Sequence, residues 1–282
     1  MRLSKNYIEE AFFKNRDYYE LMEHRYNAAK GSLTIEPVTK EFIFRALESL
    51  KPGSRVLEIG CGVGSNVKWL AEHFSGVTFL GSDISEIGIS YALQKVGSLV
   101  NLGFTVDDIQ DSRLESGGFS LIIAQSVFEH LTDYRKAVAE CFRLLGDDGK
   151  VVVRVGNGGR PGAGFFGFLK DFAKYLLRYN RAENLNPTFV INSEDPEGRR
   201  KQHMENFDIC SIPSDVLSMD FKKVGFVIHS FTTCRELSRL TERYGNGNAL
   251  QRKLMDLYIN ADVFPFNHMG RVTVLSASKQ VL

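Results

Sequence analysis

The residues best suited to chemistry in this chain surround a short glycine-rich loop. Gly60 and Gly62 follow the apolar run 55–59, and Glu58 lies two positions before the first glycine. Glycines at this spacing let the backbone turn sharply and approach a ligand without an intervening Cβ atom. A carboxylate beside the loop would repel a pyrophosphate but would tolerate or attract a cation. The pattern therefore predicts a loop that binds a small ligand, with a positive charge favoured near Glu58.

A second acid, Asp83, ends the next apolar run, about twenty residues after the glycine loop. In nucleotide-binding sheets, an acid at this position accepts hydrogen bonds from the hydroxyl groups of a bound ribose. The glycines follow the spacing Gly60-x-Gly62-x-Gly64, which differs from the dinucleotide fingerprint GxGxxG. The two acids and the loop together indicate a nucleoside ligand at one edge of a sheet.

Short apolar runs alternate with amphipathic segments through most of the chain. Strands are predicted over 55–59, 77–80, 104–106, 121–124 and 150–155, and helices over 38–50, 65–74 and 134–145. Further along, a helix is predicted over 214–224 and strands over 226–231 and 271–278. Strands that alternate with helices need crossover connections, so we expect a mostly parallel sheet covered on both faces.

The ordered motifs of the first half resemble those of class I S-adenosylmethionine-dependent methyltransferases, over roughly residues 38–156. The motifs that carry the resemblance are Glu58-Ile-Gly-Cys-Gly-Val-Gly64, Asp83, Asp108-Ile109 and Phe119-SLIIAQSVFEHL-Thr132. The resemblance implies an α/β fold, with a Rossmann-like seven-stranded mostly parallel sheet, helices on both faces and a helical lid insertion. It also implies that the last two strands form an antiparallel hairpin, and that S-adenosyl-L-methionine is the cofactor.

The resemblance assigns contacts with that cofactor to particular residues. Gly60 and Gly62 would pack against its methionine part, and Asp83 would hold its ribose. Asp108 and the backbone of Ile109 would bracket the adenine. The complete implied set of cofactor-binding residues is Glu58, Gly60, Gly62, Asp83, Ile84, Asp108, Ile109 and Gln125.

Two histidines are candidates for the chemistry itself. Methyl transfer is an in-line displacement at the sulfonium carbon, and an oxygen nucleophile also needs a base. Gln125 ends the fourth strand, where the resemblance places it beside the methionine and sulfonium region, and His130 follows shortly after. His203 lies in a segment expected to cover the site. We interpret both histidines as candidate catalytic bases, although a Glu-His pair like that at His130 can instead cap or orient the next helix.

A metal-dependent variant of the reaction is an alternative with few ligands to support it. Some related methyltransferases use a Glu-x-x-Glu-His cluster together with a distant histidine. Here Ser126 stands in place of the first carboxylate, which leaves Glu129, His130 and His203. We therefore expect no metal site.

After residue 156 the sequence changes character. A glycine-rich loop leads into an aromatic and basic stretch, 160–181, in which Asp171 is the only acid. Its apolar residues fall on one helical face. We interpret the stretch as a lid over the site or, alternatively, as an interfacial helix that contacts anionic lipid or a lipid-linked substrate. Sedimentation with and without anionic vesicles would separate the two.

Composition narrows the class of protein. Among 282 residues, 35 Lys and Arg balance 34 Asp and Glu, so no overall positive field favours nucleic acid, and AQSV stands where base methyltransferases carry an N/D-PP-Y motif. Four widely spaced cysteines without a CxxC pair suit a reducing cytoplasm. The N-terminus does not read as a signal peptide, and no run approaches the roughly 20 apolar residues of a membrane span.

The chain is divided on these grounds into four parts. They are an N-terminal cap at 1–37, the cofactor-binding core at 38–156, a substrate-recognition insertion or lid at 157–213, and the end of the core at 214–282 with a helical insertion at about 235–260.

The first functional hypothesis is methyl transfer to a small molecule or glycan. A sugar hydroxyl in a polysaccharide or secondary-metabolite pathway is preferred, because residues 206–217 (NFDICSIPSDVL) look similar to methyltransferases of such pathways. The alternatives are O- or C-methylation of a lipid-like quinone or polyketide, and a non-catalytic protein that binds S-adenosylmethionine. We expect a cytoplasmic protein, with contact to the inner face of the membrane through 160–181 as an alternative, and leave its oligomeric state open.

Overall fold

The computed structural model describes residues 37–96, 99–156, 214–234 and 272–280, together with Ile35 and Ile212. Its strands are β1 (Arg55–Ile59), β2 (Thr78–Asp83), β3 (Leu102–Val106), β4 (Phe119–Gln125), β5 (Leu145–Gly156), β6 (Phe226–Cys234) and β7 (Val272–Lys279). Its helices are α3 (Pro37–Glu48), α4 (Ser65–His73), α5 (Glu86–Val96), α6 (Tyr134–Leu144) and α8 (Ser214–Val224), with a 3-10 turn η1 (Phe128–His130) after β4.

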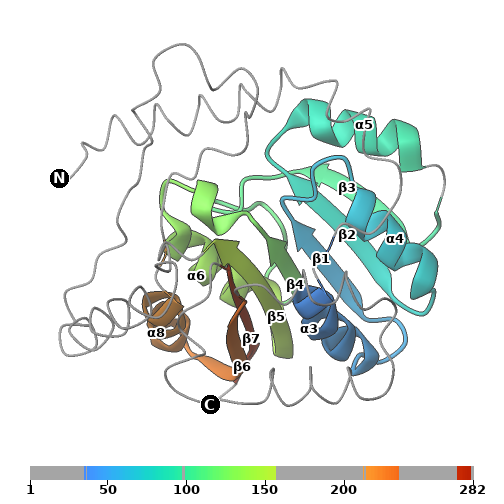
Figure 1. Ribbon diagram of the computed structural model, residues 1–282. Helices are drawn as coiled ribbons and strands as arrows, with labels where there is room; N and C mark the ends of the chain where they lie inside the picture. The colour runs from blue at the N-terminus through green and yellow to red at the C-terminus, as the bar shows by residue number, and fades with distance from the viewer. Residues whose placement is uncertain are drawn as a thin grey trace, which may run out of the picture.

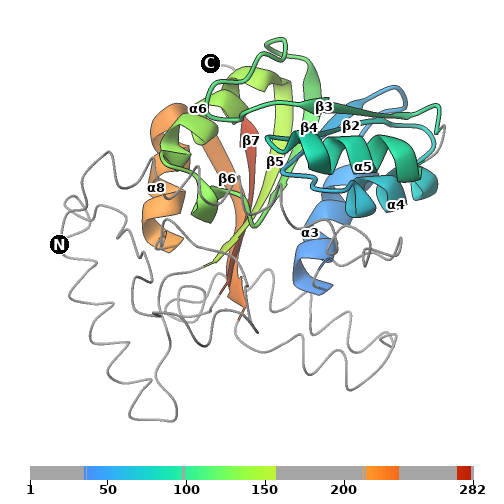
Figure 2. The same ribbon diagram turned by 90° about the horizontal axis from the view of Figure 1, so that it is seen from above.

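All of these strands belong to one seven-stranded sheet (Figure 1). The order is β3-β2-β1-β4-β5-β7-β6, and the pairs from β3 through β5 are parallel. β7 lies between β5 and β6 and is antiparallel to both. The predicted α/β class, the seven strands and the antiparallel end of the sheet are thereby confirmed. Seen from above, helices lie on both sides of the sheet (Figure 2).

Two predicted elements keep their bounds, the other helices and strands differ by a few residues at their ends, and α5 was not predicted. β1 and α8 begin and end where the sequence pattern placed them, and Pro37 begins α3, a position that tolerates its fixed φ angle and missing N–H. β4 and β5 are longer than predicted, because Phe119 pairs with Leu145 ahead of the continuous apolar runs. The partner strand therefore decides where a strand ends, and a local pattern does not contain that information.

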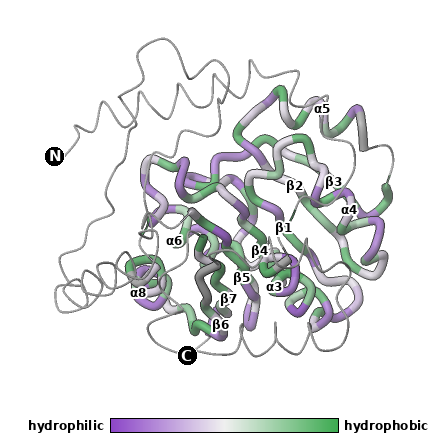
Figure 3. Tube along the Cα trace, viewed as in Figure 1, coloured by the Kyte–Doolittle hydropathy of each residue, from purple (hydrophilic) through white to green (hydrophobic). Residues whose placement is uncertain are grey.

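The sheet separates two apolar cores. α3 and α4 cover one face, and α6 and α8 cover the other. Because side chains alternate along a strand, Val56 joins the core under α3 and α4, while Leu57 and Ile59 join the opposite core. Figure 3 shows hydrophobic residues along the sheet and mixed colouring along the helices. Burial on both faces explains why the central strands are almost continuously apolar.

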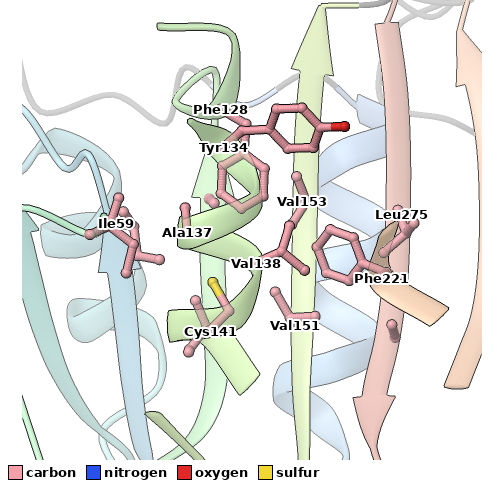
Figure 4. Packing of buried hydrophobic residues seen from close by; sticks show 14 of the residues in the cluster. Ile59, Phe128, Tyr134, Ala137, Val138, Cys141, Val151, Val153, Phe221 and Leu275 are labelled. Carbon is pink, nitrogen blue, oxygen red and sulfur yellow. The ribbon is translucent and has the colours of Figure 1, made fainter. Parts of the chain in front are cut away.

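Aromatic rings of η1, α6 and α8 pack together in the core (Figure 4). A buried polar contact joins α6 to α8 as well. The ring centroid of Phe128 lies 6.3 Å from that of Phe221 and 6.5 Å from that of Tyr134. The Tyr134 hydroxyl donates to the buried carboxylate of Asp220 at 2.5 Å, and Arg135 forms an ion pair with the same carboxylate at 2.7 Å. Since the buried acid is paired, it can fix α8 against α6.

The cap, the lid insertion and the late helical insertion lie almost entirely outside the described residues. The same is true of the aromatic and basic stretch 160–181. These predicted divisions therefore stay predictions. Within the part of the chain that the structure describes, no helix is long and apolar enough to cross a membrane.

The Asp220 contact gives a stability prediction. Asp220→Ala leaves the buried Tyr134 hydroxyl without its acceptor, so we expect a loss of about 1–3 kcal/mol in the free energy of unfolding measured with urea. Lys223→Ala is the control, because it removes only an ion pair of the same acid in which the lysine side chain is 66% exposed; its expected loss is below about 1 kcal/mol. Equal losses for the two variants would contradict a structural role for the buried contact.

Candidate functional site

The carboxyl ends of the parallel strands meet at one edge of the sheet, where the predicted ligand residues gather. From β1 the chain proceeds outward through β2 and β3, and it then returns to build β4 and β5 on the other side. In open α/β sheets, ligands bind at this point of reversal. Glu58 lies near the end of β1, Asp83 ends β2 and Gln125 ends β4. The fold therefore brings these three side chains to the edge that a ligand would occupy.

The glycine loop joins β1 to α4 through backbone in the left-handed region. Gly60, Gly62 and Gly64 have φ angles of 66°, 55° and 75°, which other residues adopt only with strain. Gly64 is the N-terminal capping residue of α4. A Cβ atom on Gly62 would meet no described atom within 4 Å. The backbone at Gly62 therefore borders open space, as a loop that cradles a ligand requires.

Gly60 is needed for a further reason. A Cβ atom at this position would lie 2.4 Å from Cγ2 of Val127, in the segment between β4 and η1. Gly60 therefore allows the loops that follow β1 and β4 to pack together at the edge formed by the carboxyl ends of the strands. The sequence analysis did not find this contact, because Val127 is distant along the chain and is an ordinary apolar residue.

Asp83 holds the glycine loop in place. One carboxylate oxygen accepts a hydrogen bond from the backbone N–H of Gly62 at 2.8 Å, and the other accepts from Ser85 at 2.9 Å. Asp83 therefore orders the loop from the end of β2, at the edge of the sheet where a ligand would lie. Ile84, which follows it, is half-buried.

Glu58 and Gln125 meet across the point where the strand order reverses. The side-chain amide of Gln125 donates to Oε1 of Glu58 at 3.3 Å. Glu58 is only 3% exposed, and Oε2 has no hydrogen-bond partner among the described residues. Burial raises the pKa of Glu58 to about 8, and the nearby Asp83 acts in the same direction, while the Gln125 amide opposes them. This edge of the sheet therefore contains a buried acid that is mostly neutral at pH 7.

Asp108 shapes the turn after β3. Its Oδ1 accepts the backbone N–H of Gln110 at 2.9 Å, and Ile109 between them is buried. The side-chain oxygen of Gln110 accepts from the Thr132 hydroxyl at 2.6 Å and from the backbone of Asp133 at 2.9 Å. The turn that would bracket an adenine is thus attached to the segment that follows η1.

η1 places His130 at this edge next to a buried acid. Glu129 is 3% exposed, and its Oε1 accepts the backbone N–H of Gly156 at 3.2 Å. Arg154 of β5 lies 4.0 Å from the same oxygen and also contacts the hydroxyl of Ser126. Burial raises the pKa of Glu129, against the opposing charges of His130 and Arg154. The histidine therefore lies beside a polar cluster that links β4 to the end of β5.

The sequence analysis considered Glu129 only as a metal ligand and as part of a Glu-His pair, and it gave Arg154 no role. A signal was present for Arg154, which is the only charged residue in the apolar run VVVRV. Ser126 has a φ angle of 53°, in the left-handed region, and its backbone N–H donates to the carbonyl of Arg154 at 2.9 Å. That conformation could not be read from the residue types.

The second candidate base, His203, lies outside the described residues, so its position relative to His130 stays a prediction. Among the residues that the structure does describe, no group of three His, Cys, Asp or Glu side chains is arranged to hold a metal ion.

Comparison with known proteins agrees with this geometry. Residues 57–153 match a family described as a methyltransferase domain. This core is a class I S-adenosylmethionine-dependent methyltransferase domain. It contains the glycine loop, the acids after β2 and β3, and η1, which confirms the family resemblance of the sequence motifs.

Relatives of the methyltransferase domain act on chemically different acceptors, as their names state. Phosphoethanolamine N-methyltransferase 1 of Arabidopsis thaliana is 33% identical over 41% of this chain and 23% of its own length. The 2-methyl-6-phytyl-1,4-hydroquinone methyltransferase of Synechocystis is 28% identical over 42% of this chain and 40% of its own length. The chain thus spans less than half of either relative.

A solved structure supports the fold. The cyclase SpnF has a TM-score of 0.55 and 16% identity, over 87% of this chain and 80% of its own. At this identity the likeness concerns the arrangement of the methyltransferase domain alone.

The glycine loop of the methyltransferase domain gives a prediction for a double-mutant cycle. Gly60→Ala should lower the free energy of unfolding by more than the roughly 1–2 kcal/mol expected from a left-handed alanine, because its Cβ would also overlap Val127. Adding Val127→Ala removes the overlapping atom, so the double variant should recover at least about 1 kcal/mol relative to additivity. Gly62→Ala is the matched control, with strain but no overlap. Additive losses at Gly60 and Val127, measured by urea unfolding, would disprove the contact.

Proposed function

We propose that the protein is an S-adenosyl-L-methionine-dependent methyltransferase that acts on a small-molecule or glycan acceptor. The observation that carries this proposal is the joint geometry at the ends of β1 and β2. There the Asp83 carboxylate fixes the backbone of Gly62 beside open space, next to the buried Glu58. The names of the relatives support methyl transfer as the reaction.

The described residues fit the three parts of this cofactor. Glu58, with one unpartnered oxygen in the described structure, suits the cationic amino-acid end. Asp83 suits the ribose hydroxyls, and the buried Ile109 with Asp108 suits the adenine. When bound, the cofactor supplies a methyl carbon made electrophilic by a positively charged sulfur.

The chain's own residues would bind the cofactor, orient the acceptor and accept its proton. The bare backbone at Gly60 and Gly62 permits close approach, which helps to exclude water and to hold an in-line geometry. His130 is the proposed base, since η1 places it at the carboxyl edge, and an imidazole nitrogen would accept the proton of the acceptor hydroxyl. His203 is a second candidate for the same role.

A sugar hydroxyl is the preferred acceptor in this proposal. The support is the similarity of residues 206–217 to methyltransferases of polysaccharide and secondary-metabolite pathways. A lipid-like quinone or polyketide is the alternative, supported by the hydroquinone methyltransferase of Synechocystis and by the aromatic stretch 160–181. We place the reaction in the cytoplasm, with contact to the inner face of the membrane as part of the alternative.

A protein that binds the cofactor without methyl transfer is the candidate from another class. The similarity to SpnF is the reason to test this candidate, because that structure has a similar fold and is named a cyclase. Incubation with S-adenosylmethionine labelled in its methyl group, and with pools of nucleotide sugars, quinones and RNA, separates the two functions. We expect label in the sugar pool. Label in the quinone pool would favour the alternative acceptor, and label in no pool would favour the binding protein.

The cofactor assignment makes its own prediction. Asp83→Ala should weaken binding of S-adenosylhomocysteine by one to two orders of magnitude in calorimetry, about 1.5–3 kcal/mol for a lost charged hydrogen bond. Asp83→Asn keeps one acceptor oxygen and should lose less. Glu86→Ala removes an exposed acid three residues further on and should leave affinity unchanged. Unchanged affinity in Asp83→Ala would rule out the ribose contact.

A further inference from the structure

Glu58 is placed in the interior of the site with little to stabilise a negative charge. It pairs in register with Gly81 of β2 on one side and Ile123 of β4 on the other. Among the described side chains, the amide of Gln125 donates a hydrogen bond to the Glu58 carboxyl. The backbone N–H of Val67 in α4 also favours the ionised form of this carboxyl. No cation is among the described groups that act on this carboxyl.

The titratable groups that face Glu58 raise the cost of ionising it. Asp83 from β2 repels a negative charge on Glu58. Cys61 belongs to the glycine loop, and its Sγ would lie 2.9 Å from a Cβ built on Gly81, beside the strand position that pairs with Glu58. Burial, together with the charges of Asp83 and Glu58, raises the pKa of the Cys61 thiol well above its ordinary value. The thiol therefore stays protonated and neutral, and it offers no positive charge to balance a Glu58 carboxylate.

A ligand that carries a positive charge reverses this balance. A buried carboxyl loses its proton when a cation within about 4–6 Å outweighs its desolvation. Glu58 lies immediately before the loop whose open backbone at Gly62 borders the proposed methionine part of the ligand. The carboxyl is therefore the described acid best placed to respond to the ammonium group of that part.

We propose that Glu58 exchanges its proton for the positive charge of the bound ligand, so that it is protonated in the free protein and is a carboxylate in the complex. The released proton goes to solvent. This inference rests on the proposed function, since it takes the amino-acid end of S-adenosylmethionine or S-adenosylhomocysteine as the cation. Cofactor affinity then becomes a function of pH through a single buried residue.

The sign of the pH dependence follows directly. Because the ligand selects the ionised form, protons compete with it, and affinity rises with pH until Glu58 is already ionised in the free protein. With a free-protein pKa of about 8, affinity should rise by about tenfold per pH unit between pH 6 and 7, pass through a maximum near pH 8 and fall above it as the ligand's own amine loses its proton. In this lower range the ligand's own amine, with an ordinary pKa of about 7.7–8.0, stays mostly protonated.

Calorimetry at pH 6.5 in two buffers of different ionisation enthalpy tests the proposal. The probe is S-adenosylhomocysteine, and we expect release of about one proton for each ligand bound. The control ligand is 5′-methylthioadenosine, which keeps the nucleoside and thioether but lacks the amino-acid end, and which should release none. Glu58→Gln should abolish the release with S-adenosylhomocysteine, and its unfolding transition in urea, compared with that of the wild-type protein, verifies that the variant is folded.

The outcomes separate this proposal from the proposed function. Failure of both ligands to bind the wild-type protein would contradict the cofactor assignment itself. Binding of S-adenosylhomocysteine without proton release, or release that persists in Glu58→Gln, would overturn only the role of Glu58. Equal release with 5′-methylthioadenosine would also overturn it, because the amino-acid cation would then not be the cause. Proton release by the wild-type protein should also diminish as the pH is raised through about 8. Release that stays constant over this range would contradict the role of Glu58.

Discussion

The parallel pairing of β1 with β4 is the constraint on which the rest of the site depends. It joins the two halves of the sheet where the chain reverses direction, and it brings Glu58 and Gln125 to hydrogen-bonding distance although they are far apart in sequence. The same pairing allows the β1–α4 loop to pack on the segment after β4, through Gly60 and Val127. Asp83 then fixes that loop from the other side. The fixed position of the β1–α4 loop, the exposed backbone of its glycines and the burial of Glu58 all follow from which strands are neighbours.

Sequence reasoning located the acids and most of the elements, although not α5, because these depend on local patterns. Residues 55–59 and 214–224 have the periodicity of their final structure, and the glycine spacing identified the loop. The contacts of Gly60 with Val127 and of Glu129 with Gly156 were not predictable in this way. Each joins ordinary residues that only the completed sheet brings together. Likewise, the raised pKa of Glu58 comes from burial, and no residue type reveals how deeply a strand end is buried.

The family match and the described site cover the cofactor side of the molecule far better than the acceptor side. Residues 57–153 contain the glycine loop, both acid-bearing strand ends and η1. Relatives that share this region are named for acceptors as different as phosphoethanolamine and a hydroquinone. A common core with varied acceptors is expected when binding of the cofactor and recognition of the acceptor are performed by different parts of a chain. The predicted insertions at 157–213 and about 235–260 therefore stay our candidates for recognition of the acceptor.

The anchors at the two ends of the segment 157–213 have a consequence for how such proteins diversify. Gly156, just before it, is held by Glu129, and α8, just after it, is held by the bond between Asp220 and Tyr134. Both anchors belong to the same side of the sheet, at η1 and α6. The entropy lost in closing a chain segment between fixed points grows only slowly with its length. The length of chain between these anchors can therefore change at little entropic cost, whereas Ile212 near its end is buried in the core. Where this segment recognises the acceptor, as we propose, new acceptor preferences can evolve without rebuilding the cofactor site.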